Sequence, residues 1–135
     1  MEFFEWKKDY ELGIKLVDEE HKQLVKLINE LERAITENKT DQVIKGVLQG
    51  LKGYINIHFT VEEEYMNVYD YSGLKSHTEA HEQFKKKIFS ISHDLEEGGL
   101  DIPKSVLVYL KKWLQEHILE TDRKLCLFLK EQKIN

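Results

Sequence analysis

Apolar residues recur at steps of three and four along most of this 135-residue chain, a spacing typical of helices with one buried face. Four such stretches follow one another with short connections and no alternating strand pattern. They are a helix that Asp18 caps and that ends near Asn38, one that Thr40 caps, one from Leu74 to Gly98, and one whose first turn contains Pro103. We therefore predict an all-α fold, an antiparallel up-down-up-down four-helix bundle that forms a single domain over residues 1–135.

Two segments lie outside these four helices. We expect residues 1–17 to form an N-terminal aromatic arm, with a turn at Gly13, that packs across one end or side of the bundle. Its aromatic residues are Phe3, Phe4, Trp6 and Tyr10. The apolar run at residues 125–129 predicts a short last helix or a continuation of the fourth one.

The second helix carries three glycines in its first half. Its buried face is predicted to consist of Val47, Leu51, Tyr54, His58, Glu62 and Tyr65. Gly46, Gly50 and Gly53 each weaken a helix by about 1 kcal/mol relative to alanine. We therefore expect a close neighbour or a bend beside them.

Composition argues against several classes of function. The chain is 41% apolar and 33% charged with a net charge of −5, as in a soluble globular protein, and its short lysine runs at 85–87 and 111–112 are interpreted as solvated helix faces. It shows no secretory signal and no uncharged apolar run of the roughly 20 residues that a membrane span needs. We expect a cytoplasmic monomer without nucleic-acid or membrane partners, in which the single Cys126 is a buried apolar filler.

Five of the six histidines lie on the predicted buried faces, with at least one on each helix: His21, His58, His77, His81 and His117. A lone histidine on an apolar face is usually a hydrogen-bonded core residue. Five unpaired buried imidazoles, however, would cost several kcal/mol against a total stability of about 5–15 kcal/mol. The sixth, His93, is turned about 160° from His77 and should face solvent. The sequence therefore predicts a metal site in the core of the bundle.

A carboxylate on the second helix can contribute to this site. Glu62 lies four residues after His58 and shares its face, whereas Glu63 and Glu64 point about 140° and 240° away from it. We therefore interpret Glu62 as the inward carboxylate.

Two acidic residues after His117, Glu120 and Asp122, are candidates for a second carboxylate ligand. In an ideal helix Glu120 lies about 60° from His117 and Asp122 about 140°. Spacing alone favours Glu120.

The whole series resembles the ligand signature of the hemerythrin family: His21, then His58 with Glu62, then His77 with His81, then His117 with Asp122. The residues around these ligands agree at 18–22, 58–59 and 113–118, and the resemblance covers essentially the whole chain. It implies that Asp122, and not Glu120, is the second bridging carboxylate. A π-type irregularity near Glu120 would reconcile this ligand with the helical spacing.

The resemblance also implies a cofactor and an activity. Two iron ions with six ligands each would take nine of twelve positions from five histidines and two bridging carboxylates, and a bridging oxo or hydroxo oxygen would take two more. The resemblance places His77, His81 and His117 on one iron and His21 and His58 on the other, which keeps the open position. The family's activity is reversible binding of O2 there, for storage, delivery or sensing, and nitric oxide or other small ligands could also bind.

Apolar residues beside these ligands look like the family's pocket wall, which would keep water away from O2. They are Leu24, Ile28, Phe59, Trp113 and Ile118. Each can also be interpreted as plain core, and large aromatic residues such as Trp113 often simply pack.

Two alternative functions remain open. A di-iron enzyme could act on peroxide or nitric oxide, but no inward acid beyond the two bridging carboxylates is evident as a proton donor, so we expect no catalytic residue. An iron-handling module would carry the metal as cargo and would lose it to a mild chelator.

Overall fold

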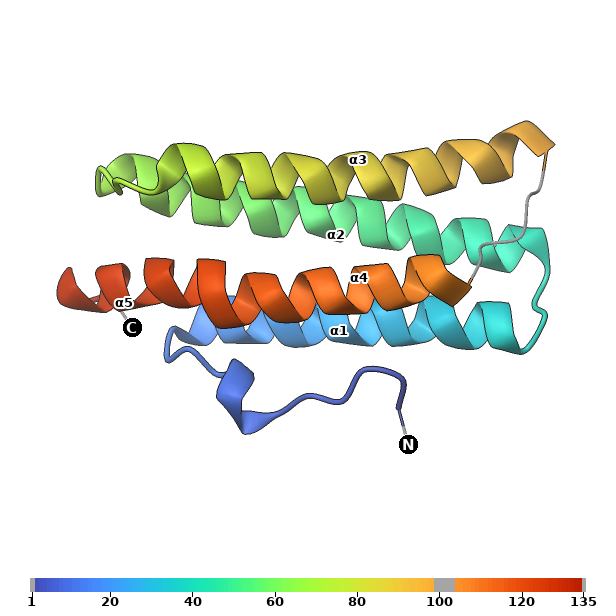
Figure 1. Cartoon of the computed structure of the whole chain (residues 1–135), viewed down its shortest axis with the longest axis horizontal. Helices are drawn as coiled ribbons and strands as arrows, with labels where there is room; N and C mark the ends of the chain where they lie inside the picture. The colour runs from blue at the N-terminus through green and yellow to red at the C-terminus, as the bar shows by residue number, and fades with distance from the viewer. Residues whose placement is uncertain (1, 99–103, 135) are drawn as a thin grey trace.

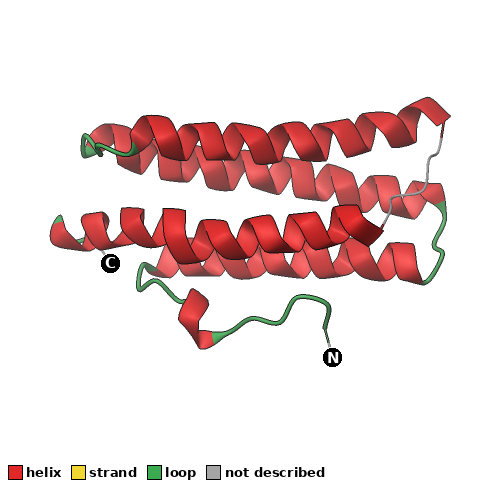
Figure 2. Ribbon diagram, viewed as in Figure 1, coloured by secondary structure: helices red, strands yellow, loops and turns green. Residues whose placement is uncertain are grey.

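Figure 1 shows the computed structural model, which describes residues 2–98 and 104–134, as four long rods in an antiparallel bundle. The helices are α1 (Lys15–Thr36), α2 (Asp41–Val68), α3 (Leu74–Gly98) and α4 (Lys104–Glu116). A π-helical segment, His117–Asp122, joins α4 without a break to α5 (Arg123–Glu131). Within the described ranges Figure 2 contains helices and loops and no strand, so the predicted all-α bundle is confirmed.

The first helix begins earlier than predicted. It starts at Lys15, so Asp18 lies inside its first turn and does not cap it. The Asp18 carboxylate instead accepts hydrogen bonds from the backbone N–H groups of Leu12 at 2.8 Å and Gly13 at 3.1 Å. These bonds fix the turn, in which Gly13 has a φ of +89°, a left-handed value that favours glycine.

The other predicted helix ends agree with the structure where it describes them. Thr40 caps α2, because its Oγ1 accepts a hydrogen bond from the backbone N–H of Val43 at 3.3 Å. The third helix ends at Gly98, as predicted, and Gly99 and Pro103 lie outside the described residues. The apolar run at 125–129 is a continuation of the fourth rod.

The N-terminal arm packs along α1 and α4, beneath the bundle in Figure 1. Phe4 is fully buried, its backbone N–H donates to Asn29 Oδ1 at 2.8 Å, and Asn29 Nδ2 donates back to its carbonyl at 2.9 Å. Lys111 Nζ donates to the carbonyl of Phe3 at 2.6 Å. The predicted aromatic arm is therefore present, and it joins the first and fourth rods.

At three places on α2 the buried residue is the one that follows the predicted residue in the sequence. Val47, Tyr54 and Tyr65 are only half-buried at the margin of the core. The fully buried residues of this helix are Leu48, Leu51, Ile55, His58, Phe59, Glu62 and Met66. Of the two alternatives for the glycines, the close neighbour is wrong, because a Cβ at Gly46, Gly50 or Gly53 would meet no atom within 4 Å, and the bend stays a prediction. They lie on the outer face, where nothing in the described chain packs.

The predicted burial of Cys126 and the predicted exposure of His93 are both confirmed. Cys126 is buried among apolar side chains, and burial raises the pKa of its thiol. His93 faces solvent, with 68% of its side chain exposed. As for membranes, none of the helices in the described ranges has the length and apolarity needed to cross one.

Candidate metal centre

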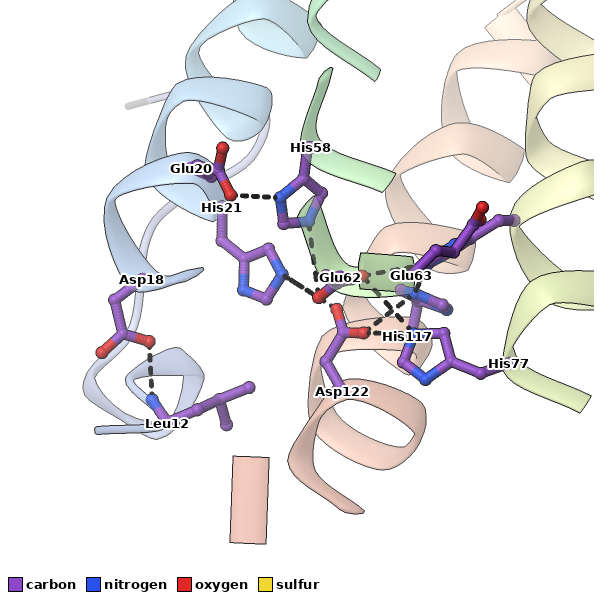
Figure 3. A network of polar contacts seen from close by, with 11 residues as sticks. Leu12, Asp18, Glu20, His21, His58, Glu62, Glu63, His77, His117 and Asp122 are labelled. Carbon is purple, nitrogen blue, oxygen red and sulfur yellow. Dashed lines mark hydrogen bonds and ion pairs between the residues drawn. The ribbon is translucent and has the colours of Figure 1, made fainter. Parts of the chain in front are cut away.

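Five histidines from all four rods turn their Nε2 atoms into one buried cluster, and Figure 3 labels His21, His58, His77 and His117 of this cluster. His21 lies near the start of α1, His58 near the end of α2, His77 and His81 near the start of α3, and His117 where α4 ends. Antiparallel packing brings these four helix segments to one level. None of the five side chains is more than 3% exposed.

Glu62 lies between two groups of these histidines. Its Oε1 is 2.9 Å from Nε2 of His81 and 3.4 Å from Nε2 of His77. Its Oε2 is 3.7 Å from Nε2 of His58 and 3.8 Å from Nε2 of His21. The two oxygens of one carboxylate therefore face different sets of imidazoles.

Asp122 divides its oxygens in the same way. Its Oδ1 is 2.9 Å from Nε2 of His77 and 3.0 Å from Nε2 of His117, and its Oδ2 is 2.8 Å from Nε2 of His21. Two groups result, in each of which the potential ligand atoms lie within 4.8 Å of one another. We call them the three-histidine subsite (His77, His81, His117) and the two-histidine subsite (His21, His58), and Glu62 and Asp122 belong to both.

The π-helical segment explains why Asp122 reaches the cluster. A π turn closes hydrogen bonds from i to i+5, so a residue five positions after His117 returns to its face. Asp122 is accordingly fully buried, while Glu120 is exposed to solvent. Ideal α-helical spacing was therefore misleading here, and the choice of Asp122 through the family resemblance agrees with the geometry.

Two further carboxylates contact the outer nitrogens of the cluster, and sequence reasoning missed both. His58 Nδ1 lies 2.9 Å from Glu20 Oε1, and His81 Nδ1 lies 2.8 Å from Glu63 Oε2. The expectation of no inward acid beyond the bridging pair is wrong, since Glu20 is only 7% exposed. Its position three residues after Val17 was a readable signal, because Val17 is on the buried stripe of α1.

The nitrogen and oxygen atoms of the cluster are better satisfied by metal ions than by contacts with one another. A carboxylate lies at Nδ1 of His58 and of His81, so the neutral form of each ring carries its proton on Nδ1 and its lone pair on Nε2. Nε2 of His81 nevertheless faces Nε2 of His117 at 3.2 Å, and both oxygens of Asp122 are buried without a well-formed hydrogen bond. Acceptors that face one another in a dry core need a cation between them. Imidazole and carboxylate together suit first-row transition metals.

Electrostatics in the cluster also favour cations. Burial by itself lowers the pKa of His21 and His77, but the carboxylates of Asp122 and Glu62 outweigh it and raise the two values to about 10 and about 9. Burial lowers the pKa of His117. Burial also opposes ionisation of Glu62 and Asp122, yet the surrounding histidines hold the pKa of both carboxyls well below their usual range.

Aromatic rings cover the three-histidine subsite. The ring of Phe59 stacks on His81 with centroids 3.8 Å apart and planes 3° apart, and Trp113 stacks on His117 at 4.5 Å and 14°. Of the five predicted pocket residues, Trp113 is half-buried, and the other four, Leu24, Ile28, Phe59 and Ile118, are fully buried in the core.

Comparisons with known proteins agree with this geometry. The model of the family described as the hemerythrin HHE cation binding domain matches residues 12–126. A bacteriohemerythrin of Clostridium acetobutylicum is 34% identical over 127 residues, which cover 89% of this chain and 96% of the relative. A myohemerythrin of Sipunculus nudus is 30% identical over 119 residues, which cover 88% of each chain. A crystal structure of wild-type hemerythrin superposes with a TM-score of 0.83 at 20% identity, covering 90% of this chain and 93% of the other.

Proposed function

This chain belongs to the hemerythrin family, and on that premise we propose that its buried cluster holds two iron ions and binds O2 reversibly, for storage, delivery or sensing. One observation carries the proposal. Glu62 and Asp122 each direct one oxygen to the three-histidine subsite and the other to the two-histidine subsite, as a pair of bridging carboxylates must.

The two subsites have different numbers of ligands. His77, His81 and His117 would hold one iron, and His21 and His58 the other, with Glu62 and Asp122 shared. Iron held by these residues would supply the O2-binding chemistry. The two-histidine subsite has one imidazole fewer, so it is the subsite that would leave room for an external ligand.

The remaining residues of the site orient the ligands and exclude water. Glu20 and Glu63 accept hydrogen bonds from His58 and His81, which fixes each imidazole with its Nε2 lone pair toward the metal. We propose as the apolar wall of the site the buried or half-buried residues Leu24, Ile28, Phe59, Trp113 and Ile118. We infer that it keeps water and acids away from bound O2.

We propose a binding protein and not an enzyme. Glu20 and Glu63, the acids in contact with ligand imidazoles, act as hydrogen-bond acceptors and so offer no proton for the reduction of peroxide or nitric oxide. Nitric oxide could also bind at the open position. We further propose one domain over residues 1–135 that works as a monomer, because all seven ligands come from one chain, and that is located in the cytoplasm, because a single cysteine cannot form an internal disulfide.

The test is anaerobic iron loading to about two ions per chain, followed by absorption spectra under argon, under O2 and under argon again. We expect a ligand-to-metal charge-transfer band that appears with O2 and disappears when O2 is removed. The His21→Ala variant should lose this band, and the matched His93→Ala variant should keep it, because His93 lies on the exposed face of α3. A single irreversible oxidation, or turnover with peroxide and a reductant, would favour the enzyme or the iron-handling module instead.

A further inference from the structure

A polar cavity of about 200 Å³ lies beside the three-histidine subsite, where α3 begins and the π segment ends. The proposed function gives it no role. Its lining consists of Tyr71, Gly73, Ser76, His77, Glu120, Thr121 and Lys124. A water molecule takes about 30 Å³ in the liquid, so the cavity has room for a small ion with a few waters.

His77 is the buried polar side chain that borders this cavity. It is 2% exposed, its Nε2 faces the carboxylates of Glu62 and Asp122, and its Nδ1 has no hydrogen-bond partner in the part of the chain that the structure describes. In Figure 3 this second nitrogen points away from the two carboxylates. His58 and His81 differ, since a glutamate accepts from Nδ1 of each. Because His77 lines the cavity and its Nε2 is directed at the two carboxylates, Nδ1 is the ring nitrogen left for a partner on the cavity side.

The first turn of α3 borders the same cavity. The N–H of Leu74 donates to the carbonyl of Tyr71, and that of His77 donates to the carbonyl of Gly73. No acceptor is found among the described residues for the N–H groups of Lys75 and Ser76, and the first turn holds no acidic residue. The start of a 25-residue helix with free N–H groups favours negative charge.

The other polar groups of the lining are mostly donors. Ser76, Thr121 and Tyr71 contribute hydroxyl groups, and Lys124 contributes an ammonium group. The one acidic residue is Glu120, whose side chain is exposed like that of Lys124, and none of the ion pairs of the described residues joins the two. The cavity thus combines donors from a buried imidazole, a helix start and a lysine.

We propose that this cavity binds a small inorganic anion, of the size of chloride or nitrate, that accepts a hydrogen bond from Nδ1–H of His77. The inference rests on the proposed function, because iron on Nε2 leaves the proton of the neutral imidazole on Nδ1. An anion at Nδ1 makes the imidazole a stronger donor to the metal and so stabilises the oxidised iron relative to the reduced iron. The occupied cavity would then make the iron pair easier to oxidise, without touching the position where O2 binds.

The experiment begins with the iron content of each protein, and then uses bromide as the anion probe. Crystals of the iron-loaded protein are soaked in sodium bromide and the bromine anomalous signal is measured. In parallel, the exchangeable imidazole N–H resonances of the iron-loaded protein are followed by NMR during titration with sodium bromide or sodium nitrate. The variants are Lys124→Met and Ser76→Ala, with Lys112→Met as a control that removes the same charge from an exposed position on α4.

We expect a bromine peak in the cavity and a saturable shift of one N–H resonance. Lys124→Met and Ser76→Ala should each weaken binding at least tenfold, while Lys112→Met should change it less than twofold. Two bound irons with no bromine peak in the cavity, or a peak that neither substitution weakens, would overturn the anion site and leave the proposed function intact. A chain that binds no iron overturns the proposed function and, with it, the donor state of His77.

Discussion

The three-histidine and two-histidine subsites share two carboxylates but differ in what holds their imidazoles. On the three-histidine side Phe59 lies flat on His81 and Trp113 lies flat on His117. On the two-histidine side His21 and His58 contact each other edge to face, with centroids 4.8 Å apart and planes 76° apart. Two of the three imidazoles of the three-histidine subsite therefore have an aromatic ring stacked flat on them, and among the described residues neither imidazole of the two-histidine subsite has one.

The outer carboxylates do not account for this difference. Each subsite has one imidazole that donates Nδ1–H to a glutamate, His58 to Glu20 and His81 to Glu63, at 2.9 and 2.8 Å. The asymmetry therefore lies in ring packing and in the number of imidazoles. The shared carboxylates should affect both ions, whereas the glutamates should act on one ion each.

The largest effect is expected from Asp122→Ala. It removes one oxygen from each subsite, so the iron content should fall from about two per chain to below one. Glu120→Ala, in the same π segment, is the control and should keep both ions because Glu120 is exposed. Metal analysis on folded, gel-filtered protein decides between them, and the reverse pattern would show that helical spacing had identified the ligand correctly.

Glu20→Ala and Glu63→Ala should separate the subsites. Loss of an acceptor at the outer nitrogen of a ligand histidine typically costs about 10–100-fold in metal affinity. Glu20→Ala should release the ion of the two-histidine subsite first, and Glu63→Ala that of the three-histidine subsite, in a chelator titration followed by spectroscopy. Glu19→Ala is the control, since 63% of that side chain is exposed. Equal weakening of both ions by either variant would contradict the assignment of one glutamate to each subsite.

The metal-free protein should lose stability in alkali. The pKa values of His21 and His77 are about 10 and about 9 in the fold, against 6.5 ordinarily. Their contribution to the free energy of unfolding is therefore complete below pH 6.5 and is lost as the pH rises through 9 to 10. Glu62 and Asp122, whose pKa values are lowered, also stabilise the fold. Their contribution to the free energy of unfolding is lost only as the pH falls into the acid range.

Thermal melts of the metal-free protein between pH 7 and pH 10.5 check this prediction. We expect the melting temperature to fall across the alkaline half of that range. The iron-loaded protein should fall less, because metal has already displaced the protons from Nε2. A metal-free melting temperature that rises from pH 8 to pH 10 would contradict the sign.

Trp113→Leu should have the smallest effect, confined to the three-histidine side. It removes the ring stacked on His117 and Phe84, and such aromatic pairs contribute about 0.5–1.5 kcal/mol beyond their buried area. Urea denaturation of the iron-loaded protein should show a loss of at least that size, with both irons retained. Tyr109→Leu, an exposed aromatic on the same helix, is the control and should change stability by less than about 0.5 kcal/mol.

Periodicity was sufficient for the fold and for most of the cluster. The five histidines of the cluster lie on apolar stripes, which the helical repeat of the sequence predicts. The inward position of Glu62 is predicted by its distance of four residues from His58. Asp122 does not follow, because the repeat changes locally from α to π and no single rotation per residue describes both.

The outer glutamates were missed for different reasons. Glu20 was not singled out among the residues around His21, although it falls on the stripe of Val17 and Leu24. Glu63 points away from His58 on its own helix, and it acts on His81 of the neighbouring helix. Its contact depends on the distance between α2 and α3, which a pattern within one helix does not contain.

The π segment also has an evolutionary consequence. A π turn holds one residue more than the α turn that it replaces, so deletion of one residue between His117 and Asp122 would restore a regular α-helix. The aspartate would then stand four positions after the histidine, as Glu62 stands after His58, and Leu125 and Leu129 of the following helix would keep their phase toward the core. The segment is therefore what a single-residue insertion into an α-helix would leave, and a lineage could gain or lose it without losing the ligand or unpacking the last helix.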